Sequence, residues 1–187
     1  MKIRASAITI GAFLLVCSFY SAVQAQHRDH LTPQEVELVK DTQILDKRIE
    51  VFIKAAERRV LVLTGTANAN SNAKQLKKDS EKWGELPSGN PGELISDIAR
   101  ILDEAITNID DVSGRDEKNP LIPKALRRLA SAATRIVDEV KPFGAQADSS
   151  FDQLTENADS IAQAASQLPP EVAKKGKTKE EKPKTTN

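Results

Sequence analysis

Apolar residues recur in steps of three and four along most of this chain, and this spacing constrains its fold more than any other feature. Such steps keep one face of an α-helix turned in one direction, whereas a half-buried strand needs alternate apolar residues. We therefore predict an all-α fold, an antiparallel bundle of four long helices plus one short helix. The long helices are expected over 32–63, 90–112, 120–143 and 147–168.

The first of these stretches predicts a single helix over 32–63. Thr32 suits the N-cap, Pro33 suits the first helical position, and Glu35 stands where a capping-box partner is found. At a rise of 1.5 Å per residue this helix would be about 46 Å long, and other helices must cover its apolar face. That face is formed by small or apolar residues: Leu38, Thr42, Leu45, Ile49, Phe52 and Ala56.

The second and third long stretches predict a helical hairpin. Asn90, Pro91 and Glu93 repeat the capping signals of the first helix, and the apolar face that follows is wide enough to predict the most enclosed helix. The polar face of 90–112 is acidic and that of 120–143 is basic. Because the connection is short, we expect the two helices to pair antiparallel with charge-complementary rims.

Glycines and prolines mark where other helices end. Gly65 is placed to end the first long helix, and Gly84 is placed to end the short helix predicted over 73–83. The stretch 169–187 is rich in lysine and nearly free of apolar residues, which predicts a disordered tail. Such a tail is a solubilising element, or it makes weak contact with an anionic envelope surface.

The first 25 residues are typical of a signal peptide. Lys2 and Arg4 precede an apolar run over 8–20, and 23–25 fits a cleavage site. We therefore expect an exported protein, periplasmic or extracellular, with a flexible leader over 26–31 and a bundle domain over 32–168. The apolar run is shorter than the roughly 20 residues of a transmembrane helix, and we expect no membrane span in the mature chain.

Composition limits the functional classes. The only cysteine, Cys17, lies in the predicted signal peptide, so we expect neither a disulfide nor a reactive thiol. Without Lys2 and Arg4 the chain has 25 basic and 27 acidic residues, a formal charge of −2. Proteins that bind nucleic acid usually carry a strongly basic face, so we expect no nucleic-acid partner.

The expected interior holds no catalytic groups. Thr42 is the only polar residue at the predicted apolar positions of the four long helices, whereas metal and cofactor sites in bundle cores need inward carboxylates and histidines. Both histidines lie in the leader, away from any nucleophile in the folded body. The acidic residues fall at spacings that face solvent, so we expect no cofactor and no enzymatic activity.

Two sets of residues are candidates for binding. His27 and His30 could bind copper or zinc through their imidazole nitrogens, or they are two solvated side chains near a frayed terminus. The apolar end of the first helix is either buried on all sides or covered by a partner, and the single tryptophan either belongs to that interface or covers the bundle. These candidate partner-binding residues are Val60, Leu61, Val62, Leu63 and Trp83.

The sequence therefore favours a non-catalytic, exported helical-bundle protein that acts as an interaction or structural module of the bacterial cell envelope. It would bind another protein or a second copy of itself through a helix face. The alternative is a periplasmic metal or small-ligand binding protein that uses the leader with His27 and His30 or a pocket between helices.

Overall fold

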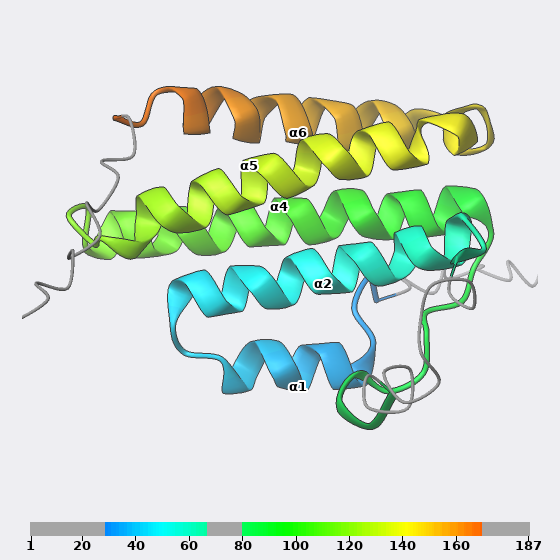
Figure 1. Cartoon of the computed structure of the whole chain (residues 1–187), viewed down its shortest axis with the longest axis horizontal. Helices are drawn as coiled ribbons and strands as arrows, with labels where there is room; N and C mark the ends of the chain where they lie inside the picture. Colours follow the sequence, from blue (N-terminus) through cyan, green and yellow to red (C-terminus); the bar gives the residue numbers. More distant parts are fainter. Residues whose placement is uncertain (1–28, 67–79, 170–187) are drawn as a thin grey trace, which may run out of the picture.

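Four long helices lie side by side in the computed structural model of this chain, which describes residues 29–66 and 80–169 (Figure 1). Every regular element among these residues is helical, and the predicted all-α antiparallel bundle is confirmed. A shorter helix, α1, lies beside α2 on the outside of the bundle. The elements are α1 (Pro33–Asp41), α2 (Leu45–Leu63), α4 (Pro91–Arg115), α5 (Leu121–Val140), the 3-10 helix η2 (Lys141–Gln146) and α6 (Ser149–Ser166).

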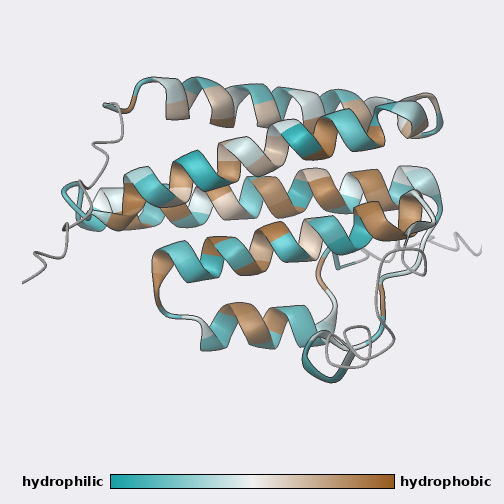
Figure 2. Cartoon of the chain, viewed as in Figure 1, coloured by the Kyte–Doolittle hydropathy of each residue, from teal (hydrophilic) through white to brown (hydrophobic). Residues whose placement is uncertain are grey.

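The long helices pack in a ring with the order α2, α4, α6, α5. α2 runs antiparallel to α4, and α5 runs antiparallel to α6. α4 and α5 also contact each other, but less extensively than the helices of these two pairs do. Figure 2 shows hydrophobic and hydrophilic residues alternating along each long helix, as expected for helices with one buried face. α4 packs against three other helices, in agreement with its predicted wide apolar face. Its fully buried residues are Ile95, Ile98, Ala99, Ile101, Leu102 and Ala105.

The predicted caps are present at two helix starts. The Thr32 hydroxyl accepts a hydrogen bond from the Glu35 backbone N–H, and the Glu35 carboxylate accepts one from the Thr32 N–H. Asn90 and Glu93 form the same reciprocal pair at the start of α4. Each pair satisfies two backbone donors that the helix itself leaves unpaired, so the caps fix where α1 and α4 begin.

The prediction of one helix over 32–63 is wrong, because the chain turns between α1 and α2. Thr42 and Ile44 both have extended backbone conformations and end one helix and start the next. The turn is stabilised by side chains, since Thr42 Oγ1 donates to the Leu38 carbonyl at 2.7 Å and Arg48 Nε donates to the Thr42 carbonyl at 2.8 Å. From Leu45 onward the predicted apolar face is buried as expected.

Other predictions concern regions that the structure describes only in part. The signal peptide (1–25), His27 and the tail after Pro169 lie outside the described residues. Of the leader, Leu31 is buried in the core, with 7% of its surface exposed. Of the short helix expected over 73–83, residues 80–83 are described and are helical. None of the described helices is long and apolar enough to cross a membrane.

Candidate functional site

Four ionisable side chains meet inside the fold where α1, α2 and α4 come together. Glu35 Oε1 lies 2.8 Å from Arg59 Nη1 and 3.1 Å from Arg58 Nε, and Arg59 Nε lies 3.9 Å from Asp97 Oδ2. All four side chains are at most 4% exposed. We call this group the buried ionic cluster. Buried charges are tolerated only when they are paired, and the members of the cluster neutralise one another.

Each oxygen of the Glu35 carboxylate has a separate partner. Oε2 accepts the hydrogen bond from the Thr32 N–H at 2.8 Å and thereby caps α1, while Oε1 faces the two guanidinium groups. Arg59 in turn donates to the carbonyl oxygens of Ala55 at 2.7 Å and His30 at 2.6 Å. The cluster therefore fastens α1 and the segment before it to α2.

Arg58 binds a second segment, which contains Gly84 and Glu85, to α2 beside the buried ionic cluster. Its Nη2 donates to the carbonyl oxygens of Gly84 and Glu85, and its guanidinium carbon lies 5.8 Å from the centre of the Trp83 ring. Gly84 has a φ of +68°, a left-handed conformation that suits glycine and ends the helix over 80–83 as predicted. Trp83 itself is buried, so the ring covers the bundle beside Arg58.

A cleft of about 940 Å³ opens beside the buried ionic cluster. Its walls are the start of α1 and the segment from Glu85 to Ser88, and both Arg59 and Asp97 line it. The expectation that the acids face solvent is therefore wrong for Glu35, Asp97 and also Asp46 on α2, which are all buried. α1 folds back over this part of the bundle and buries acids that a straight helix would have left exposed.

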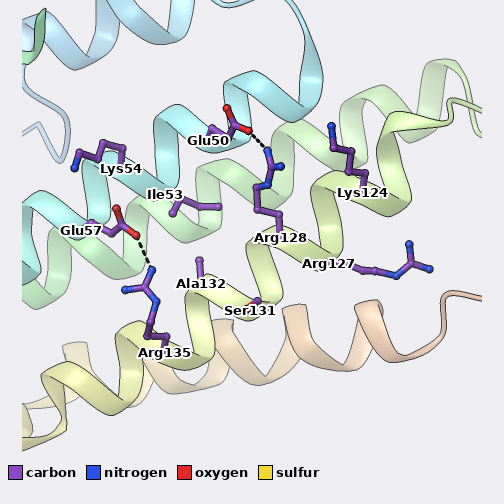
Figure 3. Close-up of a pocket in the computed structure, with 10 residues that line it drawn as sticks. All are labelled: Glu50, Ile53, Lys54, Glu57, Lys124, Arg127, Arg128, Ser131, Ala132 and Arg135. Carbon is purple, nitrogen blue, oxygen red and sulfur yellow. Dashed lines mark hydrogen bonds and ion pairs between the residues drawn. The ribbon is translucent and has the colours of Figure 1, made fainter. Parts of the chain in front are cut away.

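A second hollow, the α2–α5 groove, lies between those two helices and has a volume of about 670 Å³ (Figure 3). Ile53 and Ala132, both buried, contribute apolar surface to it, and charged side chains from both helices surround them. The remaining lining residues are Glu50, Lys54, Glu57, Lys124, Arg127, Arg128, Ser131 and Arg135.

Ion pairs join the two helices along this groove. Lys124 pairs with Asp46, Arg128 with Glu50, and Arg135 with Glu57, and in each pair the partners are 78 positions apart. A constant separation means that α2 and α5 run parallel and in register. The hairpin expected from the 90–112 and 120–143 helices is present, since α4 and α5 run antiparallel, are joined by a short turn and pack against each other. The expected charge pairing between them is wrong for Lys124, Arg128 and Arg135, because these cations of α5 bind α2 instead.

The ion pairs shift the pKa of two of their members, Asp46 and Arg135. A hydrogen bond from Lys124 holds the pKa of Asp46 below its usual value of 3.8, although burial of the carboxyl group acts in the opposite direction. Burial opposes the charge of Arg135, but its hydrogen bonds to Glu139 and Glu57 outweigh this effect and raise the pKa of the guanidinium group. Both shifts favour the charged form, of the Asp46 carboxylate and of the Arg135 guanidinium group respectively.

The groove carries more positive than negative charge. Five of its lining residues are basic and two are acidic. Lys54 forms no hydrogen bond or ion pair with the described residues, and Arg127 donates to the Pro169 carbonyl, which is uncharged. Figure 3 shows the Arg127 side chain pointing away from α2.

The structure places one of the two candidate metal ligands. His30 Nε2 lies 2.7 Å from Glu104 Oε2 on α4, with 21% and 37% of these side chains exposed. His27 lies outside the described residues. Among the residues that are described, no three histidine, cysteine or acidic side chains are grouped closely enough to hold a metal ion. Metal binding by His27 and His30 stays a prediction.

The candidate partner-binding residues differ in exposure. Val60 and Trp83 are buried, with 4% and 7% of their surface exposed, whereas Leu61, Val62 and Leu63 are half-buried. Leu63 also packs against the core. A partner at this end of α2 would contact the half-buried residues, and this interface stays a prediction.

Comparison with known proteins gives no relative: no protein-family model, curated protein or solved structure matches the chain.

Proposed function

We propose that this protein is a non-catalytic helical-bundle module of the bacterial cell envelope that, after export, acts by binding a protein partner through the α2–α5 groove. The observation that carries the proposal is the surplus of cations along the groove: Lys124, Arg128 and Arg135 are paired with acids of α2, whereas Lys54 and Arg127 have no acidic partner among the described residues. Such a surface attracts a partner of opposite charge, raises the rate of association and suppresses wrong partners.

The contacts of the buried ionic cluster support a structural role for it. Glu35 uses one oxygen for the cap of α1 and the other for two guanidinium groups, and Arg59 also holds two backbone carbonyls. A general base needs a carboxylate that can reach a substrate proton, and the Glu35 carboxylate is fully buried among its partners. Its chemistry therefore favours holding helices together over catalysis.

Isolation of the native protein from an envelope fraction, with its bound partners, tests the proposal. The double variant Lys54→Glu/Arg127→Glu reverses two groove charges and should reduce recovery of a specific partner. The matched control Lys40→Glu/Lys118→Glu makes the same change of charge at exposed sites outside the groove and should leave recovery unchanged. Equal recovery with both variants would exclude the groove as the binding surface.

A metal-binding function is a second candidate, and the position of His30 favours it. Its imidazole lies against the Glu104 carboxylate, so two metal-ligating groups already adjoin, and His27 stands three positions earlier. Calorimetric titration with copper or zinc should give heat in the wild-type protein and none after His27→Ala and His30→Ala. Heat that survives both substitutions, or no heat in the wild type, would exclude this site.

A further inference from the structure

The outer face of α6 is acidic and unneutralised. Asp148, Asp152, Glu156 and Asp159 are all exposed, and none of them forms a hydrogen bond or ion pair through its side chain with the described residues. α6 contains no lysine, arginine or histidine over Ser149–Ser166. Three of the four acids line a shallow hollow of about 480 Å³ on this face. α6 thus presents negative charge that has no cationic partner in the part of the chain that the structure describes.

α6 does not face the α2–α5 groove of its own chain. It buries Leu154, Ala158 and Ile161 against α4 and α5, and α2 lies across the bundle from it (Figure 1). The acids of α6 and the surplus cations of the groove therefore belong to different faces of one molecule. Two such faces can meet only between separate copies of the chain.

The spacing of the acids matches the spacing of the cations. Along α5 the steps from Lys124 to Arg128 to Arg135 are four and seven residues, and α2 meets them with acids at the same steps. From Asp148 to Asp152 to Asp159 the steps are also four and seven residues. If an α6 helix lay parallel to α5, its carboxylates would follow the same steps of four and seven residues as the cations of α5. The acids of α2 already pair with these cations at the same steps.

The groove cations have donors left for such a helix. An arginine has five N–H donors and a lysine three. Arg128 binds Glu50 through Nη1 alone, and Lys124 Nζ makes a single hydrogen bond, to Asp46, so both have N–H donors to spare. Lys54 has no partner among the described residues. A second row of carboxylates can therefore be bound without breaking the ion pairs between α2 and α5.

We propose that the α2–α5 groove binds α6 of a second copy of this chain, parallel to α5, through its acidic face. This inference rests on the proposed function, since it names the partner of the same groove. The contact is head-to-tail: each copy keeps a free groove at one face and a free α6 at another, so association closes into a ring or continues into a filament. Because the charges are exposed, salt weakens the association.

Sedimentation equilibrium of the purified protein measures the association. We expect a mean mass above that of the monomer at about 50 mM salt, and a fall towards the monomer at about 1 M salt, where the screening length is about 3 Å. Two charge-reversed variants test the two sides of the interface separately. Asp152→Lys/Glu156→Lys/Asp159→Lys changes α6, and Lys54→Glu/Arg127→Glu changes the groove. Each alone should weaken association by about tenfold or more.

Sedimentation equilibrium of a mixture of the two variants is the decisive measurement. The lysines on α6 of one variant complement the glutamates in the groove of the other, and the unchanged groove of the first fits the unchanged α6 of the second. The mixture should therefore associate more strongly than either variant alone. The control Asp103→Lys/Asp110→Lys/Glu117→Lys makes the α6 charge change on exposed residues of α4 and the following turn and should associate like the wild type.

Three results would overturn the inference: a wild type that is monomeric at low salt, association that survives both reversals, or a mixture that stays monomeric. A monomeric wild type that still binds an envelope protein through Lys54 and Arg127 would refute self-association and leave the proposed function intact. A wild type that neither associates with itself nor recovers a specific envelope partner would refute both the self-association and the proposed function.

Discussion

Glu35 Oε1 lies 2.8 Å from Arg59 Nη1, and these side chains are 0% and 1% exposed. The two residues are 24 positions apart, which corresponds to about 36 Å along a straight helix. Their contact is possible only because the chain reverses between α1 and α2. The ion pair is thus a buried polar link between α1 and α2.

Replacing Glu35 separates its two roles. In Glu35→Gln the amide oxygen can still cap α1, but two buried guanidinium groups lose the charge of the Glu35 carboxylate, and we expect a loss of about 3–5 kcal/mol in the free energy of unfolding. Thr32→Ala removes only a capping hydrogen bond and should cost about 1 kcal/mol. Urea unfolding of both variants measures the difference. Equal costs would mean that the ion pairs make no net contribution.

The parallel register of α2 and α5 predicts which residues are coupled. A double-mutant cycle with Glu50→Ala and Arg128→Ala should give a coupling free energy of about 0.2–1 kcal/mol, since these partners form a half-exposed ion pair. The mismatched cycle with Glu57 and Arg128 should give a value near zero. Stronger coupling in the mismatched cycle would contradict the register.

Local signals in the sequence are sufficient to predict where two helices begin and which faces are buried. Thr32 with Glu35 and Asn90 with Glu93 form their capping boxes as predicted, because this interaction involves only residues three positions apart. The buried face of α4 follows its apolar spacing in the same way. These features depend on neighbours along the chain, so a single sequence contains the required information.

The turn at Thr42 and the buried ionic cluster depend on contacts between distant residues. The apolar spacing continues without interruption from Leu38 through Thr42 to Leu45, and neither glycine nor proline marks the break. What favours the break is the contact of Glu35 with Arg59, which exists only after the chain has reversed. The prediction that the acids face solvent fails for Asp97 because nothing local in the sequence indicates that α1 and the segment after Gly84 lie over this part of α4.

The low pKa of Asp46 makes stability depend on pH in the acid range. Lys124 lowers the pKa of this carboxyl group in the folded state, so the unfolded chain binds its proton at a higher pH than the folded one does. The stabilisation is therefore complete above pH of about 4–5, close to the unfolded value, and is lost as the pH falls through the folded pKa. Asp46→Asn removes this contribution.

The difference in unfolding free energy between the wild type and Asp46→Asn should therefore shrink as the pH falls below about 4, through the lowered pKa of the folded state. Urea unfolding at a series of pH values measures it. Asp103→Asn is the matched control, because the exposed Asp103 carboxylate forms no bond with the described residues that protonation could break. A difference for Asp46→Asn that stays constant with pH would show that the Lys124 pair does not contribute to stability.

Trp83 is the only tryptophan of the chain, so its fluorescence reports how the segment from Ser80 to Glu85 is held on α2. Arg58→Lys removes the guanidinium that binds the Gly84 and Glu85 carbonyls, and we expect emission at longer wavelength as water reaches the ring, with a loss of about 1–3 kcal/mol in stability. Lys82 also lies 5.8 Å from the ring but is exposed, so Lys82→Ala should leave the emission unchanged. Identical spectra for the wild type and Arg58→Lys would mean that packing of Trp83 alone holds this segment in place.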